Sequence, residues 1–294
     1  MDKRIDVLGV QISAVTTPEA LNRVADLVKD KKDHYIVTPN PEFVMQALKD
    51  GGFREVINRA DMALADGIGI LWAAYYLSIP IGSFLPLTKV QTVIQLFLTG
   101  LSIVLNPKML TKVIPERITG ADMLWEISKL ASERGWNIFL LGAAPGVAYE
   151  ASRKLQLLYP ELKVADVMPG PPYESEAEVI ARIRLVKPKF VFLAFPAREQ
   201  LRWMQTYTGK LGGVTMMGIG GAFDFIAEAT PLNSPVKDSK ARRAPKWLQD
   251  RGLEWLWRYL IQPWRRERIK TATIDFMKTV KAYKLARNNE KCKM

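Results

Sequence analysis

The chain has 294 residues, 48% hydrophobic and 24% charged, so it can bury a substantial core and is not disordered throughout. Its single cysteine, Cys292, excludes a disulfide framework and a cysteine-based zinc site, which favours a reducing cytosolic setting. The formal charge of +12 is uneven, because residues 242–294 hold 15 Lys+Arg against 5 Asp+Glu, a net of +10. Such a tail could meet nucleic acid, anionic lipid or an anionic substrate, and charge alone does not choose among them.

The N-terminal stretch MDKRIDVLGVQIS has no sustained apolar core and no small-residue cleavage site, which argues against a signal peptide. Apolar runs then alternate with helix-like segments: IDVLGVQI, HYIVTP, MALADG, NIFLLGA, KVADVM, KFVFLAFP and VTMMGIGG. This alternation predicts an α/β fold for residues 1–241, a Rossmann-like sheet with helices on both faces. Thr17 and Pro18 should open one helix, and Gly135 should close another that starts near Ala121.

An apolar insertion at about residues 82–114 interrupts this alternation. It contains VQTVIQLFLTGLSIVL, 16 residues punctuated by Gln91, Thr92, Gln95 and Thr99. A bilayer-spanning helix needs roughly 20 apolar residues, so the stretch is short for a span. We expect a helix or hairpin lying on a membrane surface, with cover for the core or a subunit interface as the alternative.

Residues 242–294 form a basic, Trp-rich appendage. Arg258, Arg265 and Arg268 are separated by seven and three residues, which places them on one side of a helix if that helix continues past Pro263. Guanidinium groups suit phosphate oxygens, and the interleaved tryptophans suit a lipid headgroup layer. The alternative is an ordinary solvated basic helix. Three lysines of the final segment should attract anionic lipid interchangeably: Lys278, Lys281 and Lys284.

Polar residues follow the apolar runs at turns where α/β proteins bind ligands. Asp66, in ADGIG, could accept a proton from a bound hydroxyl, or it could simply cap the next helix. Thr38 and Asn40, in TPNPE, carry the same ambiguity. His34 is the only histidine, which excludes Ser-His-Asp and histidine-based metal sites and favours a structural role in a buried strand.

Two glycine-rich turns could cradle phosphate. In LGAAPG, Gly142 and Gly146 could present backbone N–H groups to a nucleotide, and Asp166, twenty residues further on, could meet a ribose hydroxyl. The sequence is not G-x-G-x-x-G, and the alternative is a tight turn with close helix packing. GIGGAFDF supplies a second such turn through Gly220 and Gly221, which would equally suit a plain turn.

Taken together, the motifs resemble one family. In order they read TPNPEFV, ADGIG, PERITG, LGAAPG, KPKFVFLAFP, GIGGAFDF, RAPKW, GLEWLWR and QPWRRER, which is similar to the WecG/TagA/CpsF glycosyltransferases over nearly the whole chain. The resemblance implies inverting transfer of N-acetylmannosamine or a related sugar from a UDP donor to undecaprenyl-diphosphate-linked N-acetylglucosamine. The product would be a bacterial surface polymer such as teichoic acid or exopolysaccharide, made by a peripheral protein on the cytoplasmic face of the membrane.

The resemblance also implies roles for matching residues. Asp66 would be the general base for the acceptor hydroxyl, with Thr38 and Asn40 beside it. Arg117 of PERITG would bind the diphosphate or sugar of the donor. The tail arginines would close over the site and meet the departing UDP or the lipid diphosphate.

Three features depart from the family pattern, and one of them is the link ATPLNSPVKDSKA at about residues 228–241, which is longer than the family's and could change how the tail docks. The family usually has P-K/R-Q-E after the sixth apolar run, whereas this chain reads PAREQ, so Arg198 replaces the site glutamine or Gln200 takes its place. The apolar insertion stands where the family has a short connection. The chain also has no D-x-D motif, so we expect no metal or other cofactor, with arginines neutralising the leaving diphosphate.

Two other functions compete with this one. LGAAPG and Asp166 would suit a dinucleotide-dependent oxidoreductase, and the tail would suit a non-enzymatic membrane or nucleic-acid adaptor. The preferred interpretation has no nucleic-acid partner and leaves a homo-oligomer open.

Overall fold

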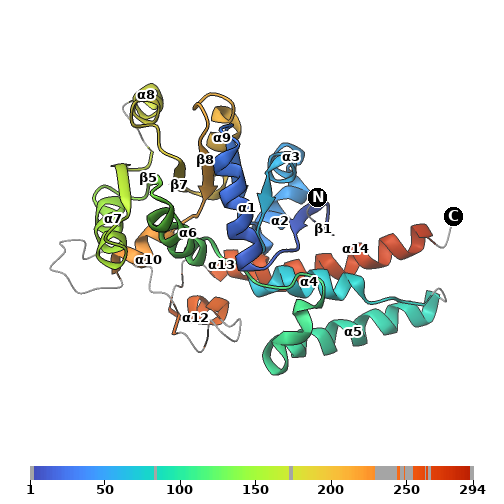
Figure 1. Ribbon diagram of the computed structural model, residues 1–294. Coiled ribbons are helices and arrows are strands. Elements are labelled where there is room, and N and C mark those ends of the chain that lie inside the picture. Colours follow the sequence, from blue (N-terminus) through green and yellow to red (C-terminus); the bar gives the residue numbers. More distant parts are fainter. Residues whose placement is uncertain are drawn as a thin grey trace.

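The computed structural model describes residues 3–82, 85–171, 175–228, 244–245, 248, 254–261, 263 and 266–291. Its centre is a parallel six-stranded sheet in the order β4-β3-β8-β7-β5-β6 (Figure 1). The strands are β3 (His34–Val37), β4 (Met62–Ala63), β5 (Asn137–Gly142), β6 (Lys163–Met168), β7 (Phe190–Ala194) and β8 (Thr215–Gly218). The predicted α/β class is therefore confirmed.

Helices cover both faces of the sheet, as predicted. One face carries α1 (Thr17–Lys29), α6 (Gly120–Arg134), α7 (Val147–Leu158) and α10 (Ala222–Glu228). The other carries α2 (Pro41–Lys49), α3 (Gly51–Arg59), α8 (Glu176–Val186) and α9 (Ala197–Tyr207). Strand β7 shows why two layers are needed: Phe190 and Phe192 are buried in one core, whereas Val191 and Leu193 are buried in the other.

Helix boundaries follow the sequence signals closely. Helix α6 begins after Thr119, whose hydroxyl accepts a hydrogen bond from the Asp122 N–H at 3.1 Å, and it ends at Gly135 in the left-handed conformation. Helix α1 has Thr16 as its N-cap, one residue before the predicted position, in a capping box with Glu19.

The first apolar run differs from its prediction. IDVLGVQI is not a strand of the main sheet but an antiparallel hairpin, β1 (Arg4–Val7) and β2 (Val10–Ser13). Leu8 and Gly9 have φ of 55° and 85°, and the Gly9 N–H donates to Asp6 Oδ1 at 3.2 Å. Positive φ at both turn residues reverses the chain within two residues, which a continuous apolar run conceals.

A layer of helices lies beside the sheet at the lower right of Figure 1. It contains α4 (Ile68–Ser78), α5 (Leu85–Leu105) and α14 (Phe276–Lys291), with η1 (Pro107–Lys112) after α5. Two short elements, α13 (Arg266–Lys270) and η3 (Thr271–Asp275), lead into α14, and α12 (Glu254–Ile261) precedes them. Phe276 and Val280 of α14 are buried in the same core as α4.

One tail lysine contradicts its predicted role. Lys284 is only 5% exposed, and its Nζ donates to the Tyr76 carbonyl at 2.6 Å and to Gln95 Oε1 at 2.7 Å. It therefore joins α14 to α4 and α5 and is not interchangeable with the exposed Lys278.

Candidate active site

The polar turns predicted from the sequence meet at the carboxyl edge of the sheet. Because all six strands are parallel, the turns that follow β3, β4, β7 and β8 leave the sheet on the same side. Backbone hydrogen bonds tie them together: Asp66 N–H donates to the Pro39 carbonyl at 3.0 Å, and Ile118 N–H donates to the Ala65 carbonyl at 2.9 Å. The TPNPE, ADGIG and PERITG loops are thus neighbours, although they are far apart in the sequence.

Asp66 is half-buried in the loop between β4 and α4. The N-cap of α4 is Gly67, at φ 103°, so Asp66 stands one residue before the cap position. A carboxylate held at a strand end by its own backbone has the position that a general base requires.

Thr38 and Asn40 both have structural partners in the neighbouring loop. Asn40 is the N-cap of α2, and its Oδ1 accepts from the Phe43 N–H at 3.0 Å. Its amide nitrogen has no hydrogen-bond partner within the described part of the chain. Thr38 is buried and donates from Oγ1 to the Gly218 carbonyl at 3.2 Å. Asn40 therefore keeps donors for a ligand, whereas Thr38 joins β3 to β8.

Arg117 is half-buried in a loop that its neighbours fix on both sides. Glu116 accepts hydrogen bonds from the backbone N–H and the hydroxyl of Thr17, both at 2.7 Å. On the other side, a β-carbon at Gly120 would lie 3.0 Å from the Ile219 Cα, so the start of α6 touches the turn after β8. Within the residues that the structure describes, Arg117 has no carboxylate or hydrogen-bond partner, which leaves its guanidinium for an anion.

The altered PAREQ segment separates Arg198 from Gln200. Gln200 is 1% exposed, and its Oε1 accepts from the Gly220 N–H at 3.1 Å. Arg198 is exposed and pairs with Asp50 at 3.5 Å, toward the start of α3. Gln200 thus holds the glycine turn after β8, while Arg198 points to a neighbouring helix.

The LGAAPG turn combines a packing requirement with open space. Gly142 has φ 131°, and a β-carbon there would lie 2.5 Å from the Ala194 carbonyl oxygen, so close packing alone demands a glycine. Gly146 is the N-cap of α7, and a β-carbon there would meet nothing within 4 Å. In the second glycine turn, Gly220 has φ 54°, and Gly221 precedes α10.

Asp166 is not brought to this edge. It lies in the middle of β6, where its Oδ1 accepts from the Val167 N–H at 2.8 Å and its Oδ2 pairs with Arg182. Since β6 is the edge strand farthest from β3 and β4, Asp166 is separated from the loops that carry Asp66 and Asn40.

One tail arginine does reach the site. Arg268 makes two hydrogen bonds of 2.9 Å to the two carboxylate oxygens of Glu42. Glu42 belongs to the TPNPE motif and lies in the first turn of α2, two residues after Asn40. The sequence interpretation overlooked Glu42, although its place in that motif was a usable signal. The Arg258 side chain and Arg265 lie outside the described residues.

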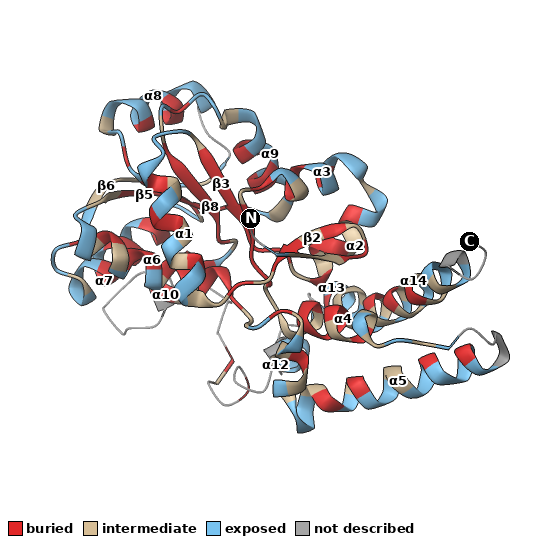
Figure 2. Ribbon diagram, turned by 45° about the vertical axis from the view of Figure 1, so that its right-hand side comes forward, coloured by how far each residue is buried: buried red, intermediate tan, exposed pale blue. Residues whose placement is uncertain are grey.

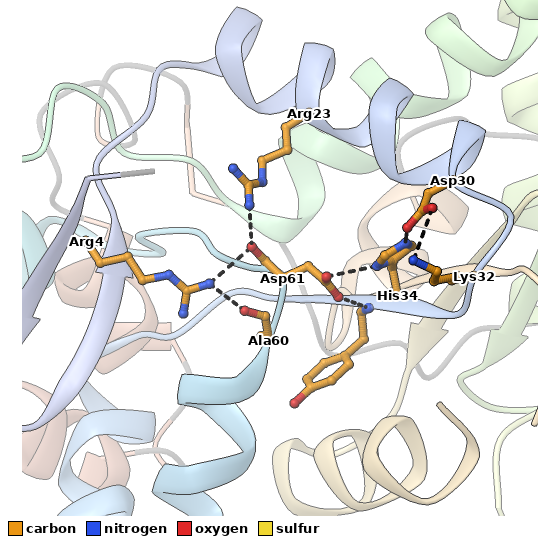
Figure 3. Close-up of polar contacts among 8 residues, drawn as sticks. Arg4, Arg23, Asp30, Lys32, His34, Ala60 and Asp61 are labelled. Atoms are coloured by element: carbon orange, nitrogen blue, oxygen red, sulfur yellow. Dashed lines mark hydrogen bonds and ion pairs between the residues drawn. The ribbon is translucent and has the colours of Figure 1, made fainter. Parts of the chain in front are cut away.

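The only histidine lies at the opposite edge of the sheet. His34 Nδ1 is 2.8 Å from Asp61 Oδ1 and its Nε2 is 3.1 Å from Asp30 Oδ2, while Arg4 donates to the Asp61 carbonyl at 3.2 Å (Figure 3). This network joins the amino ends of β3 and β4, so the structural role predicted for His34 is confirmed. Among the described residues, no group of three or more His, Cys, Asp or Glu side chains is placed to hold a metal ion.

An open parallel sheet with an aspartate, arginines and glycine turns at its carboxyl edge is an arrangement that binds ligands at that edge, and the arginines and glycine turns suit a phosphate-bearing ligand. The chain matches the Glycosyl transferase WecG/TagA/CpsF family over residues 5–95 and 89–290, so it belongs to that family and is a glycosyltransferase. Both competing functions, the oxidoreductase and the non-enzymatic adaptor, are therefore set aside.

Curated relatives extend over the same length. The chain is 27% identical over 281 residues to the N-acetylglucosaminyldiphosphoundecaprenol N-acetyl-beta-D-mannosaminyltransferase of Staphylococcus aureus strain NCTC 8325 / PS 47, covering 95% of this chain and 93% of the relative. The proteins of that name from strains COL and MRSA252 are similar to the same degree and over the same share of each chain.

Proposed function

We propose that this chain transfers an N-acetylmannosaminyl group from a UDP donor to N-acetylglucosaminyl-diphospho-undecaprenol, for surface polymer synthesis at the cytoplasmic face of the membrane. The observation that carries the proposal is similarity to transferases of that name over 95% of this chain. It is supported by the convergence of the TPNPE, ADGIG and PERITG loops at one sheet edge.

In the proposed reaction, the Asp66 carboxylate accepts the proton of an acceptor hydroxyl. The hydroxyl oxygen forms a bond to the anomeric carbon of the donor, and the bond from that carbon to the diphosphate oxygen breaks. UDP leaves with the electron pair, and attack from the opposite face inverts the anomeric centre. Asp66 keeps the proton until it passes to water.

The leaving diphosphate gains negative charge in this step, and arginine forks are suited to it. We assign this role to Arg117 and to the tail arginines Arg258, Arg265 and Arg268. Arg117 is supported by having no partner within the described residues, and Arg268 by its contact with Glu42 in the helix that follows Asn40. Arginines in these places would remove the need for a metal ion.

The nucleotide is best placed near LGAAPG. Strand β5 connects outward to β6, whereas its neighbour β7 connects the other way to β8, so the chain diverges between β5 and β7. Open α/β sheets bind ligands at such switch points. The open space around Gly146, at the start of α7, supports a phosphate there.

The test is Asp66→Asn, which preserves size and removes the proton acceptor. Turnover of radiolabelled UDP-sugar on a short-chain lipid acceptor should fall on the order of 10²- to 10⁴-fold, with unchanged thermal unfolding. Asp26→Asn is the matched control, because Asp26 is an exposed aspartate of α1 with only a loose 3.9 Å contact to Lys29. Near-native turnover by folded Asp66→Asn protein would reject the assignment.

A further inference from the structure

Helix α5 turns its apolar side toward solvent and buries its threonines and Ser102. Its outward side is apolar and at least 44% exposed at every one of these positions: Leu87, Val90, Val93, Ile94, Phe97, Leu98, Leu101, Val104 and Leu105. Its inward side contains the buried residues Thr88, Thr92, Thr99 and Ser102, with Leu96 and Ile103 packed against the core. A helix on the surface of a protein in water normally has the opposite arrangement, so this surface is built for an apolar environment.

The hydroxyls of Thr92, Thr99 and Ser102 donate to carbonyls of α5 itself, and further hydrogen bonds join α5 to the helices beneath it. Trp72 Nε1 donates to Thr99 Oγ1 at 3.0 Å, and the Tyr76 hydroxyl donates to the Thr92 carbonyl at 3.1 Å. Gln95 receives the Lys284 ammonium from α14 at 2.7 Å. These contacts come from α4 and α14 along the helix, so α5 is held flat against the protein with its apolar side outward.

The charged residues of the segment that forms this face are all basic. No aspartate or glutamate occurs between Asp66 and Glu116, whereas Lys89, Lys108 and Lys112 are present and exposed. If two copies met through this face, these lysines would approach one another without a carboxylate to pair with. Anionic lipid headgroups would supply the missing negative charge.

A second apolar surface lies on the same side of the molecule. Helix α12 exposes Trp255, Tyr259 and Leu260 by 39%, 40% and 63%. In both views α5 and α12 are at the bottom, and α8 is at the top (Figures 1 and 2). Amphipathic aromatics near an apolar helix are typical of the membrane–water interface.

We propose that the outer face of α5, from Leu87 to Leu105, lies in the plane of an anionic lipid bilayer as a monotopic anchor separate from the basic tail. This stretch of 19 residues is, among the described residues, the one helix long and apolar enough to cross a membrane, and 22% of its most apolar 18-residue window is buried. The bonds to α4 and α14 keep it along the protein surface, so it enters only one leaflet. Helix α4 starts two residues after Asp66, which places the acceptor-side loop one helix away from the lipid.

The test measures binding to vesicles without any substrate, so its outcome is independent of the proposed transfer reaction. Phe97→Gln/Leu98→Gln/Leu101→Gln removes three exposed apolar side chains and leaves the charge unchanged. Partitioning onto phosphatidylglycerol/phosphatidylcholine vesicles should weaken on the order of 10²-fold. The matched control, Leu157→Gln/Leu158→Gln/Leu185→Gln, removes leucines that are 67%, 60% and 71% exposed on α7 and α8, and should bind as the parent does.

A fluorophore distinguishes lipid from a second copy of the chain as the partner of the outer face of α5. In a Cys292→Ser background, an environment-sensitive dye attached through Phe97→Cys should shift to the blue only when vesicles are added, and the same dye attached through Leu185→Cys should not shift. Equal vesicle binding by the α5 variant and the parent would overturn the proposal. A blue shift without vesicles that grows with protein concentration, together with a dimer in sedimentation, would also overturn it in favour of an interface between copies.

Discussion

Gln200 shows how a side chain can act on the site without facing the substrate. Its Oε1 holds the Gly220 N–H, and its side chain occupies the space where a β-carbon on Gly218 would stand, 2.1 Å from Nε2 and 2.7 Å from Cγ. The last residue of β8 must therefore be glycine, because Gln200 lies over it. In PAREQ the amide of Gln200 thus supports the glycine turn after β8.

We predict that Gly218→Ala and Gln200→Ala are strongly non-additive. Gly218→Ala should push the glutamine away from Gly220 and lower the free energy of unfolding by about 1–3 kcal/mol, the usual cost of stranding a buried polar group. In the Gln200→Ala background the same change should cost much less, because the clash is gone. Urea unfolding of the four proteins checks this, and equal costs in both backgrounds would contradict it.

The sequence predicted which residues lie at the site better than it predicted their structural roles. Asp66 and Asn40 both follow a strand and precede a helix, yet only Asn40 is the cap. The difference depends on Gly67 at φ 103°, a backbone angle that residue spacing does not report. Arg268 was predicted as a phosphate ligand, and its pairing with Glu42 could not be predicted, because that contact depends on where the tail lies against α2.

The spacing of charges along α14 did not predict that Lys284 is buried. Its spacing from Lys278 and Lys281 suggests one solvated face, but α5 covers that part of α14. Since the insertion that forms α5 is distant in sequence, no local pattern could reveal the cover. The same applies to α5 itself, whose apolar content was evident but whose inverted orientation depends on α4 and α14.

Burial lowers the pKa of Lys284 from 10.5 to about 8. Between pH 8 and about 10 the folded protein has then lost this proton while the unfolded chain still holds it, so stability should rise with pH across that window. Relative to Lys284→Met, the free energy of unfolding of the parent should gain on the order of 2–3 kcal/mol. Burial raises the pKa of Tyr76 to about 12, so that neighbour does not titrate in the window. A pH-independent difference between the two proteins would contradict the prediction.

The tail cannot be removed without disturbing the core. Phe276 and Val280 of α14 are buried with α4, and a β-carbon on Gly69 would lie 2.7 Å from Pro41 and 3.8 Å from Phe276. Removing everything after Arg242 would therefore expose the core and the back of α5 together. Loss of activity in such a truncation would report on folding, membrane binding and catalysis at once, so point variants are needed.

A substitution of Arg268 can separate catalysis from folding and membrane binding. Arg268 contacts the candidate site, and its side chain is 60% exposed rather than buried in the core. Arg268→Ala should lower turnover on the order of 10²- to 10³-fold, as expected for loss of a fixed donor to developing charge, while vesicle binding stays nearly intact. Arg268→Lys should recover little, because an ammonium cannot reproduce the planar fork. Lys278→Ala, an exposed cation of α14, is the matched control and should retain turnover.

Glu42→Gln distinguishes catalysis from support, since it weakens the ion pair but leaves the guanidinium in place. If Arg268 meets the leaving diphosphate, Glu42→Gln should retain most turnover, because the paired carboxylate is not itself needed for charge neutralisation. If Glu42→Gln reproduces the loss seen in Arg268→Ala, the pair only positions α2, and the diphosphate role is wrong. If instead detergent-solubilised acceptor restores Arg268→Ala fully, the arginine is a membrane anchor.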